Sequence, residues 1–194
     1  MPTSLDEDVE KLRGSLNGLP EPQVEPPLIV VSGLPGAGKS FFCRTLAEKL
    51  SFLILGSDAL RRVLFPSPQY GEHENKRLFS AWHVLIEDLL GKGIPVIFDA
   101  TNLLEHHREY VYRAAERTRA KLILVWVEAP PEVVRQRLLA REKAAIPEYH
   151  SEAGWEVYNK MMPRREKISR NHLIVDTSQD ITAAVDKIVR ATTR

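Results

Sequence analysis

The chain has 194 residues, with 27 Lys and Arg against 26 Asp and Glu, and its net charge of +1 gives no field that would draw a polyanion to the whole molecule. The length suits one domain. No stretch approaches the roughly 20 apolar residues that a membrane helix needs, and the acidic start lacks the apolar core of a secretory signal. A single cysteine, Cys43, excludes an internal disulfide and favours a cytoplasmic protein.

The charge is distributed unevenly. Residues 1–27 hold six acidic and two basic residues, a net charge of −4, which leaves +5 on residues 28–194. A capping-box pattern from Ser4 to Glu7 and apolar residues at helical spacing predict a short amphipathic helix that docks on the domain. The prolines of "GLPEPQVEPP" then predict an extended connector. We therefore expect an N-terminal acidic helix with its connector over residues 1–27, and one domain over residues 28–194.

After residue 27, short apolar runs alternate with helical patterns. Strands that are apolar throughout and separated by helices predict an α/β fold, in which a parallel sheet is covered by helices on both faces. The expected strands are Leu28–Ser32, Phe52–Leu55, Pro95–Phe98, Leu122–Val127 and Leu173–Val175. Helices are expected near residues 38–50, 57–64, 71–91, 103–119, 131–143, 151–167 and 180–192.

A glycine-rich loop lies between the first expected strand and the helix after it. Its residues, Gly33-Leu34-Pro35-Gly36-Ala37-Gly38-Lys39-Ser40, match the pattern G-x-x-x-x-G-K-[ST] in full. Such a loop wraps a phosphate with backbone N–H groups, and the following helix directs its N-terminal partial positive charge at the same anion. We expect Lys39 to reach the β- and γ-phosphates and the Ser40 hydroxyl to ligate Mg²⁺. The sequence therefore predicts nucleotide binding by this loop and the next residue, Phe41.

Asp99 ends an apolar strand in "IPVIFDATN", and open parallel sheets place ligand groups at this carboxyl edge. A carboxylate there can support a nucleotide-bound Mg²⁺, or it can cap the following helix. We favour the metal-supporting role. Thr101 and Asn102 follow at the same edge, where they can position an acceptor or serve as capping residues.

Asp58 emerges just past the second expected strand, in "LILGSDALRR". Arg61 and Arg62 lie three and four residues later, so on a helix they share a face with Asp58. This face could grip an acceptor that carries a phosphate or carboxylate, with Asp58 orienting the acceptor hydroxyl and taking its proton. The spacing is equally compatible with a helix cap at Ser57 or Asp58 and a solvated arginine pair.

Arg137 and Arg141 lie four residues apart in "EVVRQRLLAREKA". A mobile lid at about residues 131–150 that carries arginine over the transferring phosphate would neutralise charge and exclude water. The alternative is a solvated amphipathic helix that turns inward the side chains of Val133, Leu138 and Leu139.

Two further groups of side chains have open roles. Asp176 and Thr177 follow the last expected strand, where they can shape an adenine pocket or cap the next helix. His106, His107 and Arg108 follow the strand that ends in Asp99 and can line the acceptor side, although surface histidines are the commoner case.

The motifs "GLPGAGKS", "SDALRR", "FDATN" and "RQRLLAR", in this order and spacing, resemble those of the small P-loop kinases related to polynucleotide kinase and zeta toxins, and most closely the bacterial ATP-binding proteins of that group. The likeness covers about residues 28–190. It implies a P-loop NTPase three-layer sandwich with a five-stranded sheet of order 2-3-1-4-5, ATP with Mg²⁺, and transfer to a hydroxyl. The sequence departs from the group at Phe41, where Thr usually follows the loop serine, and has no phosphatase partner domain. If the roles known in this group are transferred to the matching motif positions, the resemblance implies that Asp58 is the catalytic base and Arg61 an acceptor-binding residue. It also implies that Arg137 and Arg141 are lid residues and that Asp99 supports the metal.

Other classes of nucleotide-binding protein have different sequence requirements. A GTPase would need the base-reading pattern N-K-x-D, and the pairs Asn75-Lys76 and Asn159-Lys160 lack the aspartate. A nucleotide-binding module that transfers no phosphate remains a rival, because the motifs beyond the first loop are short.

The acceptor is the least determined partner. A long nucleic-acid track should appear as a basic groove with interleaved aromatic residues. The three tryptophans lie in apolar patterns typical of a core, and the basic run "PRREKISR" at 163–170 is expected on the surface unless it lies over the cleft. We therefore rank a small-molecule or nucleotide acceptor first and a polynucleotide 5′-hydroxyl, as a short end, second. No membrane partner is expected, and the oligomeric state is left open.

Overall fold

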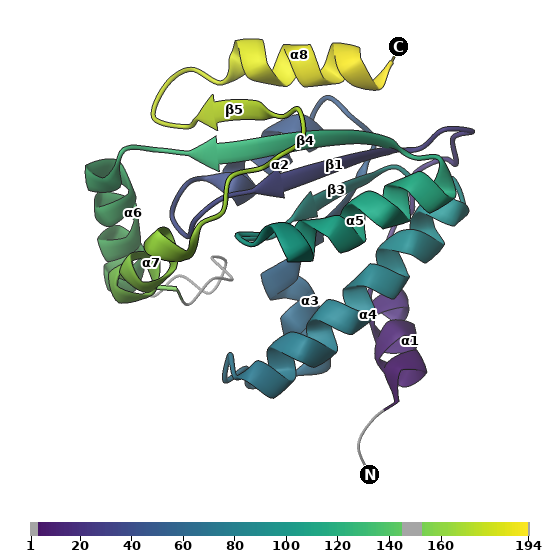
Figure 1. Cartoon of the computed structure of the whole chain (residues 1–194), viewed down its shortest axis with the longest axis horizontal. Coiled ribbons are helices and arrows are strands. Elements are labelled where there is room, and N and C mark those ends of the chain that lie inside the picture. The colour runs from purple at the N-terminus through teal and green to yellow at the C-terminus, as the bar shows by residue number, and fades with distance from the viewer. Residues whose placement is uncertain (1–3, 145–152, 194) are drawn as a thin grey trace.

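The computed structural model describes residues 4–144 and 153–193. Its centre is a parallel sheet of five strands in the order β2-β3-β1-β4-β5 (Figure 1). The strands are β1 (Pro27–Ser32), β2 (Leu53–Gly56), β3 (Val96–Asp99), β4 (Lys121–Glu128) and β5 (Leu173–Asp176). This arrangement confirms the predicted fold class and the strand order that the resemblance implied.

Helices cover both faces of the sheet (Figure 1). They are α1 (Leu5–Gly14), α2 (Lys39–Ala47), α3 (Ser57–Leu64), α4 (Glu72–Gly91), α5 (Glu105–Thr118), α6 (Pro131–Ala144), α7 (Trp155–Met161) and α8 (Thr182–Thr192), with a short 3₁₀ turn, η1, at Met162–Arg164.

Successive side chains of a strand point to opposite faces, so each strand contributes to two cores. In β1, Leu28 and Val30 pack into a cluster with α1, α3, α4 and α5. Ile29 and Val31 pack into a second cluster with α2 and α8, which contains the buried thiol of Cys43. Burial on both faces explains why the strands read as uninterrupted apolar runs.

The N-terminal helix α1 packs against α4 and α3. Val9 and Leu12 are buried in the core, and the expected capping box of Ser4 and Glu7 is present. The carboxylate of Asp8, itself buried, accepts two hydrogen bonds from Arg77 of α4, at 2.6 and 3.0 Å. The acidic helix therefore meets the rest of the chain through apolar contacts and a two-pronged ion pair.

Two helix expectations are corrected. The inward side chains of α6 are Val134 and Leu138, whereas Leu139 is exposed, because α6 packs on the glycine-rich loop and α7 rather than on the sheet. The helix expected over 151–167 ends at Met161, since Pro163 lacks the N–H that would continue it. Residues 145–152 of the expected lid and helix lie outside the described residues.

The register of the sheet brings the polar ends of the strands together. Asp99 of β3 is paired with Val31 of β1 on one side and with Gly56 of β2 on the other. On the other half of the sheet, Glu128 of β4 is paired with Asp176 of β5. The segments that follow all five strands therefore start along one edge, which is where a parallel sheet places its ligands.

Candidate active site

The loop over residues 33–40 joins β1 to α2, and its glycines allow close packing of the backbone. Gly36 and Gly38 have φ angles of 76° and 93°, which side chains rarely tolerate. A Cβ on Gly38 would lie 2.7 Å from Oγ1 of Thr177, and one on Gly36 would lie 2.8 Å from the Val134 side chain. The loop is thus supported from behind by α6 and by the turn after β5.

The front of the loop presents a cation and a helix terminus. α2 begins at Lys39, where backbone N–H groups have no acceptor within the helix and can receive an anion. The Lys39 side chain crosses the loop, and its Nζ donates to the carbonyl of Leu34 at 3.2 Å. This is the arrangement of donors that a chain of phosphates requires.

Ser40 and Asp99 meet at the foot of α2. The Ser40 hydroxyl donates to Oδ2 of Asp99 at 2.6 Å, although the two residues are 59 positions apart. A hydroxyl and a carboxylate are oxygen ligands of the kind that Mg²⁺ prefers, together with phosphate oxygens and water. The pair Ser40–Asp99 therefore fits a metal that is held partly by the nucleotide.

Thr177 follows β5 and closes the back of the loop. Its hydroxyl contacts the carbonyl of Ala37 at 2.6 Å, and Arg137 of α6 donates to the hydroxyl and carbonyl of Thr177 at 2.8 and 2.9 Å. Arg137 also reaches the Gly36 carbonyl at 3.4 Å. The Arg137 guanidinium thus joins α6 to the glycine-rich loop and to the turn after β5, and its place over the transferring phosphate stays a prediction.

The neighbouring residues on this side differ in their contacts and exposure. Asp176 accepts a hydrogen bond from the backbone N–H of Ser178 at 2.8 Å, and the pKa of Asp176 is lowered by its hydrogen bonds with Ser178 and by the charge of Arg137. Arg141 lies one turn further along α6, and its lid role stays a prediction. Phe41 is 53% exposed at the first turn of α2, so its ring is accessible beside the loop.

Asp58 stands in the first turn of α3, two residues after Gly56, whose register partner is Asp99. The structure therefore places the predicted base at the strand tip next to the Ser40–Asp99 pair. Arg61 of the same helix is buried: it donates to Asn75 of α4 at 2.7 Å, lies 3.5 Å from Glu74, and its guanidinium sits 4.8 Å from the centre of the Tyr70 ring.

In this position Arg61 joins α3 to α4, and its acceptor-binding role stays a prediction. Its partners on α4 were missed at the sequence level. They lie 13 and 14 positions from Arg61, and no motif in the sequence connects them with it.

Thr101 and Asn102 lie directly beside the loop. The Thr101 carbonyl accepts a hydrogen bond from the backbone N–H of Gly33 at 3.2 Å. Asn102 is buried, has a positive φ of 44°, and its Nδ2 atom has no hydrogen-bond partner among the described residues. An acceptor or a water would satisfy this amide, which keeps Asn102 a candidate for substrate contact.

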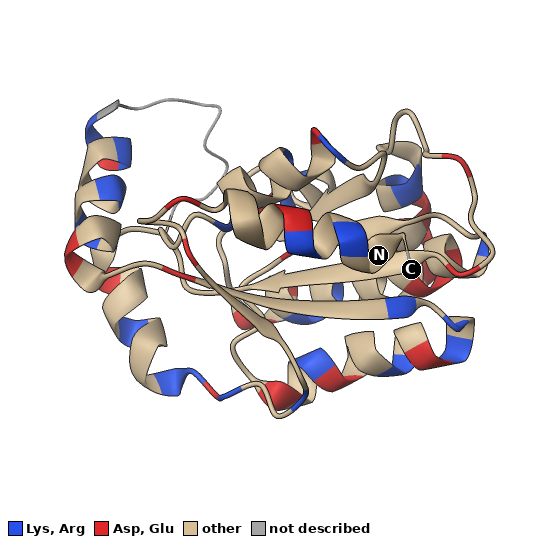
Figure 2. Ribbon diagram, turned by 90° about the horizontal axis from the view of Figure 1, so that it is seen from above, with Lys and Arg blue, Asp and Glu red and all other residues tan. Residues whose placement is uncertain are grey.

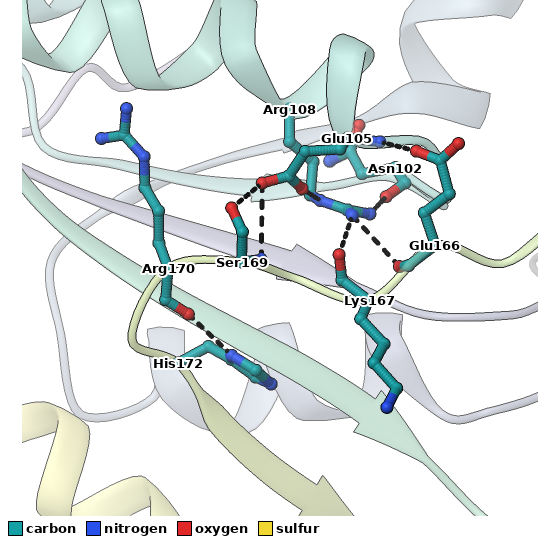
Figure 3. A network of polar contacts seen from close by, with 8 residues as sticks. All are labelled: Asn102, Glu105, Arg108, Glu166, Lys167, Ser169, Arg170 and His172. Atoms are coloured by element: carbon teal, nitrogen blue, oxygen red, sulfur yellow. Dashed lines mark hydrogen bonds and ion pairs between the residues drawn. The ribbon is translucent and has the colours of Figure 1, made fainter.

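Arg108 has a structural role, which corrects its predicted place on the acceptor side. Its side chain is fully buried on α5. The guanidinium donates to the carbonyls of Asn102, Glu166 and Lys167 at 2.5, 3.1 and 3.0 Å, and to the Glu105 carboxylate at 2.6 Å (Figure 3). Burial alone would raise the pKa of Glu105, but hydrogen bonds from Ser169 and Arg108 lower it. Arg108 thus ties the segment after η1 to the edge of the sheet.

The two adjacent histidines diverge. His106 is exposed, whereas His107 is half-buried, and its ring centre lies 4.7 Å from that of Phe79 on α4. Phe79 also contacts His83, whose pKa burial lowers to about 4. His107 therefore belongs to an aromatic contact between α4 and α5.

A glycine-rich loop at the carboxyl edge of a sheet of order 2-3-1-4-5, with a serine–aspartate pair at its foot, defines a small P-loop kinase-like domain. The chain belongs to the AAA domain family AAA_33, whose sequence profile matches residues 28–168. Within the described residues, no helix combines the length and apolarity needed to cross a membrane.

Known proteins are similar to this chain in sequence or in fold, at low identity. The L-seryl-tRNA(Sec) kinase of Methanococcus maripaludis is 22% identical over 187 residues, covering 84% of this chain and 71% of that protein. Among crystal structures, Kti12 of Chaetomium thermophilum in complex with ADP-AlF3 has a TM-score of 0.70 at 21% identity, covering 86% of this chain and 99% of Kti12. The APS kinase CysC of Mycobacterium tuberculosis, in complex with AMPPNP and APS, has a TM-score of 0.66 at 16% identity, covering 90% of this chain and 100% of CysC.

Proposed function

We propose that the protein is an ATP-dependent phosphotransferase that moves the γ-phosphate of ATP to a hydroxyl of a small-molecule or nucleotide acceptor. The observation that carries the proposal is the contact of 2.6 Å between Ser40 and Asp99 at the foot of the P-loop. Two relatives that are named kinases, and the nucleotide analogues in the Kti12 and CysC structures, support it. The single, buried Cys43 fits action in the reducing cytoplasm.

In the proposed mechanism, the backbone of residues 33–41 and the Lys39 ammonium bind the phosphates of ATP and orient the γ-phosphate for transfer. Ser40 and Asp99 would hold Mg²⁺, which, when bound, neutralises charge on the phosphates. Asp58 orients the acceptor hydroxyl and takes its proton as the new bond to phosphorus forms. Thr177 and Arg137 act from behind, by keeping the loop in its phosphate-binding shape.

A polynucleotide 5′-hydroxyl is the second candidate acceptor, and the tRNA substrate in the name of the Methanococcus maripaludis relative favours keeping it. The test offers [γ-³²P]ATP with nucleosides, sugars, antibiotics and 5′-hydroxyl oligonucleotides. We expect one class to be labelled. Release of free phosphate alone, with every acceptor, would instead indicate a hydrolytic or regulatory module.

The variant Asp58→Asn separates transfer from nucleotide binding. We expect ATP affinity close to that of the wild type, because the phosphate cradle is intact, and a transfer rate that falls by about 10²- to 10⁴-fold, because the proton acceptor is lost. Ala59→Ser, which changes an exposed neighbour, is the matched control. Unchanged turnover in Asp58→Asn would remove Asp58 from the mechanism.

A further inference from the structure

The segment from Lys160 to Arg170, which we call the basic strap, concentrates positive charge at one place in the fold. It carries five cations, Lys160, Arg164, Arg165, Lys167 and Arg170, against one acidic residue, Glu166. Figure 2 shows Lys and Arg of α7 and of α6 at the same end of the molecule. The net charge of the strap is therefore +4, close to that of the whole of residues 28–194.

The backbone of the strap is fixed although it contains little regular structure. The N–H of Glu166 donates to the carbonyl of Leu103 at 3.0 Å, and Arg108 holds the carbonyls of residues 166 and 167. Ile168 is buried in the core beneath. Since the main chain is held at successive residues, the strap presents its cations from a fixed support.

The strap lies next to the P-loop. Arg108 binds the strap and the Asn102 carbonyl with one guanidinium, and the preceding carbonyl, that of Thr101, accepts the N–H of Gly33. Arg165 reinforces this placement, because its guanidinium sits 5.4 Å from the Trp126 ring, on the β4 residue that is in register with Ser32. A ligand on the strap would thus have one end close to the phosphate-binding loop.

Three cationic side chains of the strap are not paired with any group in the described part of the chain. The side chains of Lys160, Arg164 and Lys167 are exposed, and none of the three forms a hydrogen bond or ion pair with residues 4–144 and 153–193. In Figure 3 the Lys167 side chain extends away from the Arg108 network. By contrast, the two arginines expected on the acceptor side, Arg61 and Arg108, donate their hydrogen bonds to groups inside the protein.

We infer that the basic strap binds the phosphodiester backbone of a short single-stranded nucleic acid. Arg170 is already paired with Glu116 at 2.9 Å, so the other charged residues of the strap leave a net charge of +3. A phosphate monoester carries about −1.5 to −2, which is too little to balance this charge, whereas successive nucleotides each add one negative charge. The inference rests on the proposed phosphotransfer for one point, and there it favours the second candidate acceptor: the bound strand delivers its 5′-hydroxyl to Asp58.

The test measures binding of a fluorescein-labelled, single-stranded RNA 10-mer to the full chain by fluorescence anisotropy. Saturating Mg²⁺-AMPPNP fills the nucleotide site, and the salt concentration is varied. The test variant is Arg164→Gln/Lys167→Gln. The matched control is Arg113→Gln/Lys187→Gln, which removes two exposed cations from α5 and α8.

We expect the strap variant to lose affinity roughly 10-fold at 100 mM salt and to lower the slope of log Kd against log salt by about 1.4, which corresponds to two phosphate contacts on a single strand. The control variant should keep the wild-type affinity and slope. A DNA 10-mer should behave as the RNA does, because the contacts are to phosphates.

Three results would overturn the inference: no binding by the wild type, equal losses in the strap and control variants, or binding of AMP with the same salt slope as the 10-mer. Failure of the proposed function would look different. In that case the strap would bind the 10-mer as described, and no acceptor would receive labelled phosphate.

Discussion

Arg108 shows how a residue that reads as a site candidate can have a structural task. Its charge is fully buried and is balanced by Glu105 and by three main-chain carbonyls. The sequence could not reveal this, because two of the carbonyls belong to residues 58 and 59 positions later in the chain. Ser40 and Asp99, by contrast, were predictable, since a motif fixes the serine and a strand end fixes the aspartate.

Replacement of Arg108 by Met should lower the free energy of unfolding by about 3 kcal/mol or more, because buried carbonyls lose their donor. Urea denaturation measures the effect. Arg113→Met, an exposed site on the same helix, is the control and should change stability by less than about 0.5 kcal/mol. Equal stabilities of the two variants would contradict the role assigned to Arg108.

The Ser40–Asp99 pair makes a prediction about metal dependence. In Ser40→Ala and in Asp99→Asn we expect the affinity for Mg²⁺-ATP to fall by roughly 10- to 100-fold. The affinity for ATP in excess EDTA should change much less, because the loop amides and Lys39 remain. Isothermal titration calorimetry with and without Mg²⁺ gives both values. A loss of the same size in EDTA would mean that the variants damage the loop itself.

Among the secondary-structure elements, apolar runs predicted all five strands to within a residue or two, because both faces of the sheet are covered. The helices after β4 were harder to predict. α6 turns Val134 inward because it packs on Leu34 of the P-loop, and this tertiary contact has no counterpart in the local pattern. The helix α7 ends before Pro163, which is a local signal, but the hydrogen bonds of Arg108 to the carbonyls of residues 166 and 167 are remote in sequence.

The element α1 lies outside the matched family region, yet it is part of the core. We expect Leu12→Ala to cost about 2–5 kcal/mol of stability, because Leu12 is completely buried. Leu5→Ala, at a residue that is 44% exposed on the same helix, should cost less than about 0.5 kcal/mol. Thermal unfolding compares them. If the two changes have the same small effect, α1 is not docked in solution.

For the molecule as a whole, acid stability should depend on the aromatic contact between α4 and α5. Burial lowers the pKa of His83 from 6.5 to about 4, so between these values the unfolded chain binds a proton that the folded chain does not. The contribution of neutral His83 to the free energy of unfolding is therefore complete above pH 6.5, and it is lost as the pH falls from 6.5 towards 4. The expected loss between pH 6.5 and 5 is about 2 kcal/mol.

Urea unfolding at pH 6.5 and at pH 5 measures this loss, and this range lies above the titration of most carboxylates. In His83→Phe the difference between the two pH values should shrink by most of that amount. His73→Phe, at an exposed residue of the same helix, should keep the wild-type difference. An unchanged pH dependence in His83→Phe would place its source elsewhere.

The ties formed by Arg108 and Thr177 also bear on when the protein becomes competent during synthesis. Both draw on residues that are translated well after their partners: the carbonyls of residues 166 and 167, and the Thr177 hydroxyl that supports Ala37. A nascent chain that has left the ribosome only as far as α7 has made its P-loop but still lacks the support behind it. A loop that is translated early in the domain thus receives support from a residue that is translated 140 positions later.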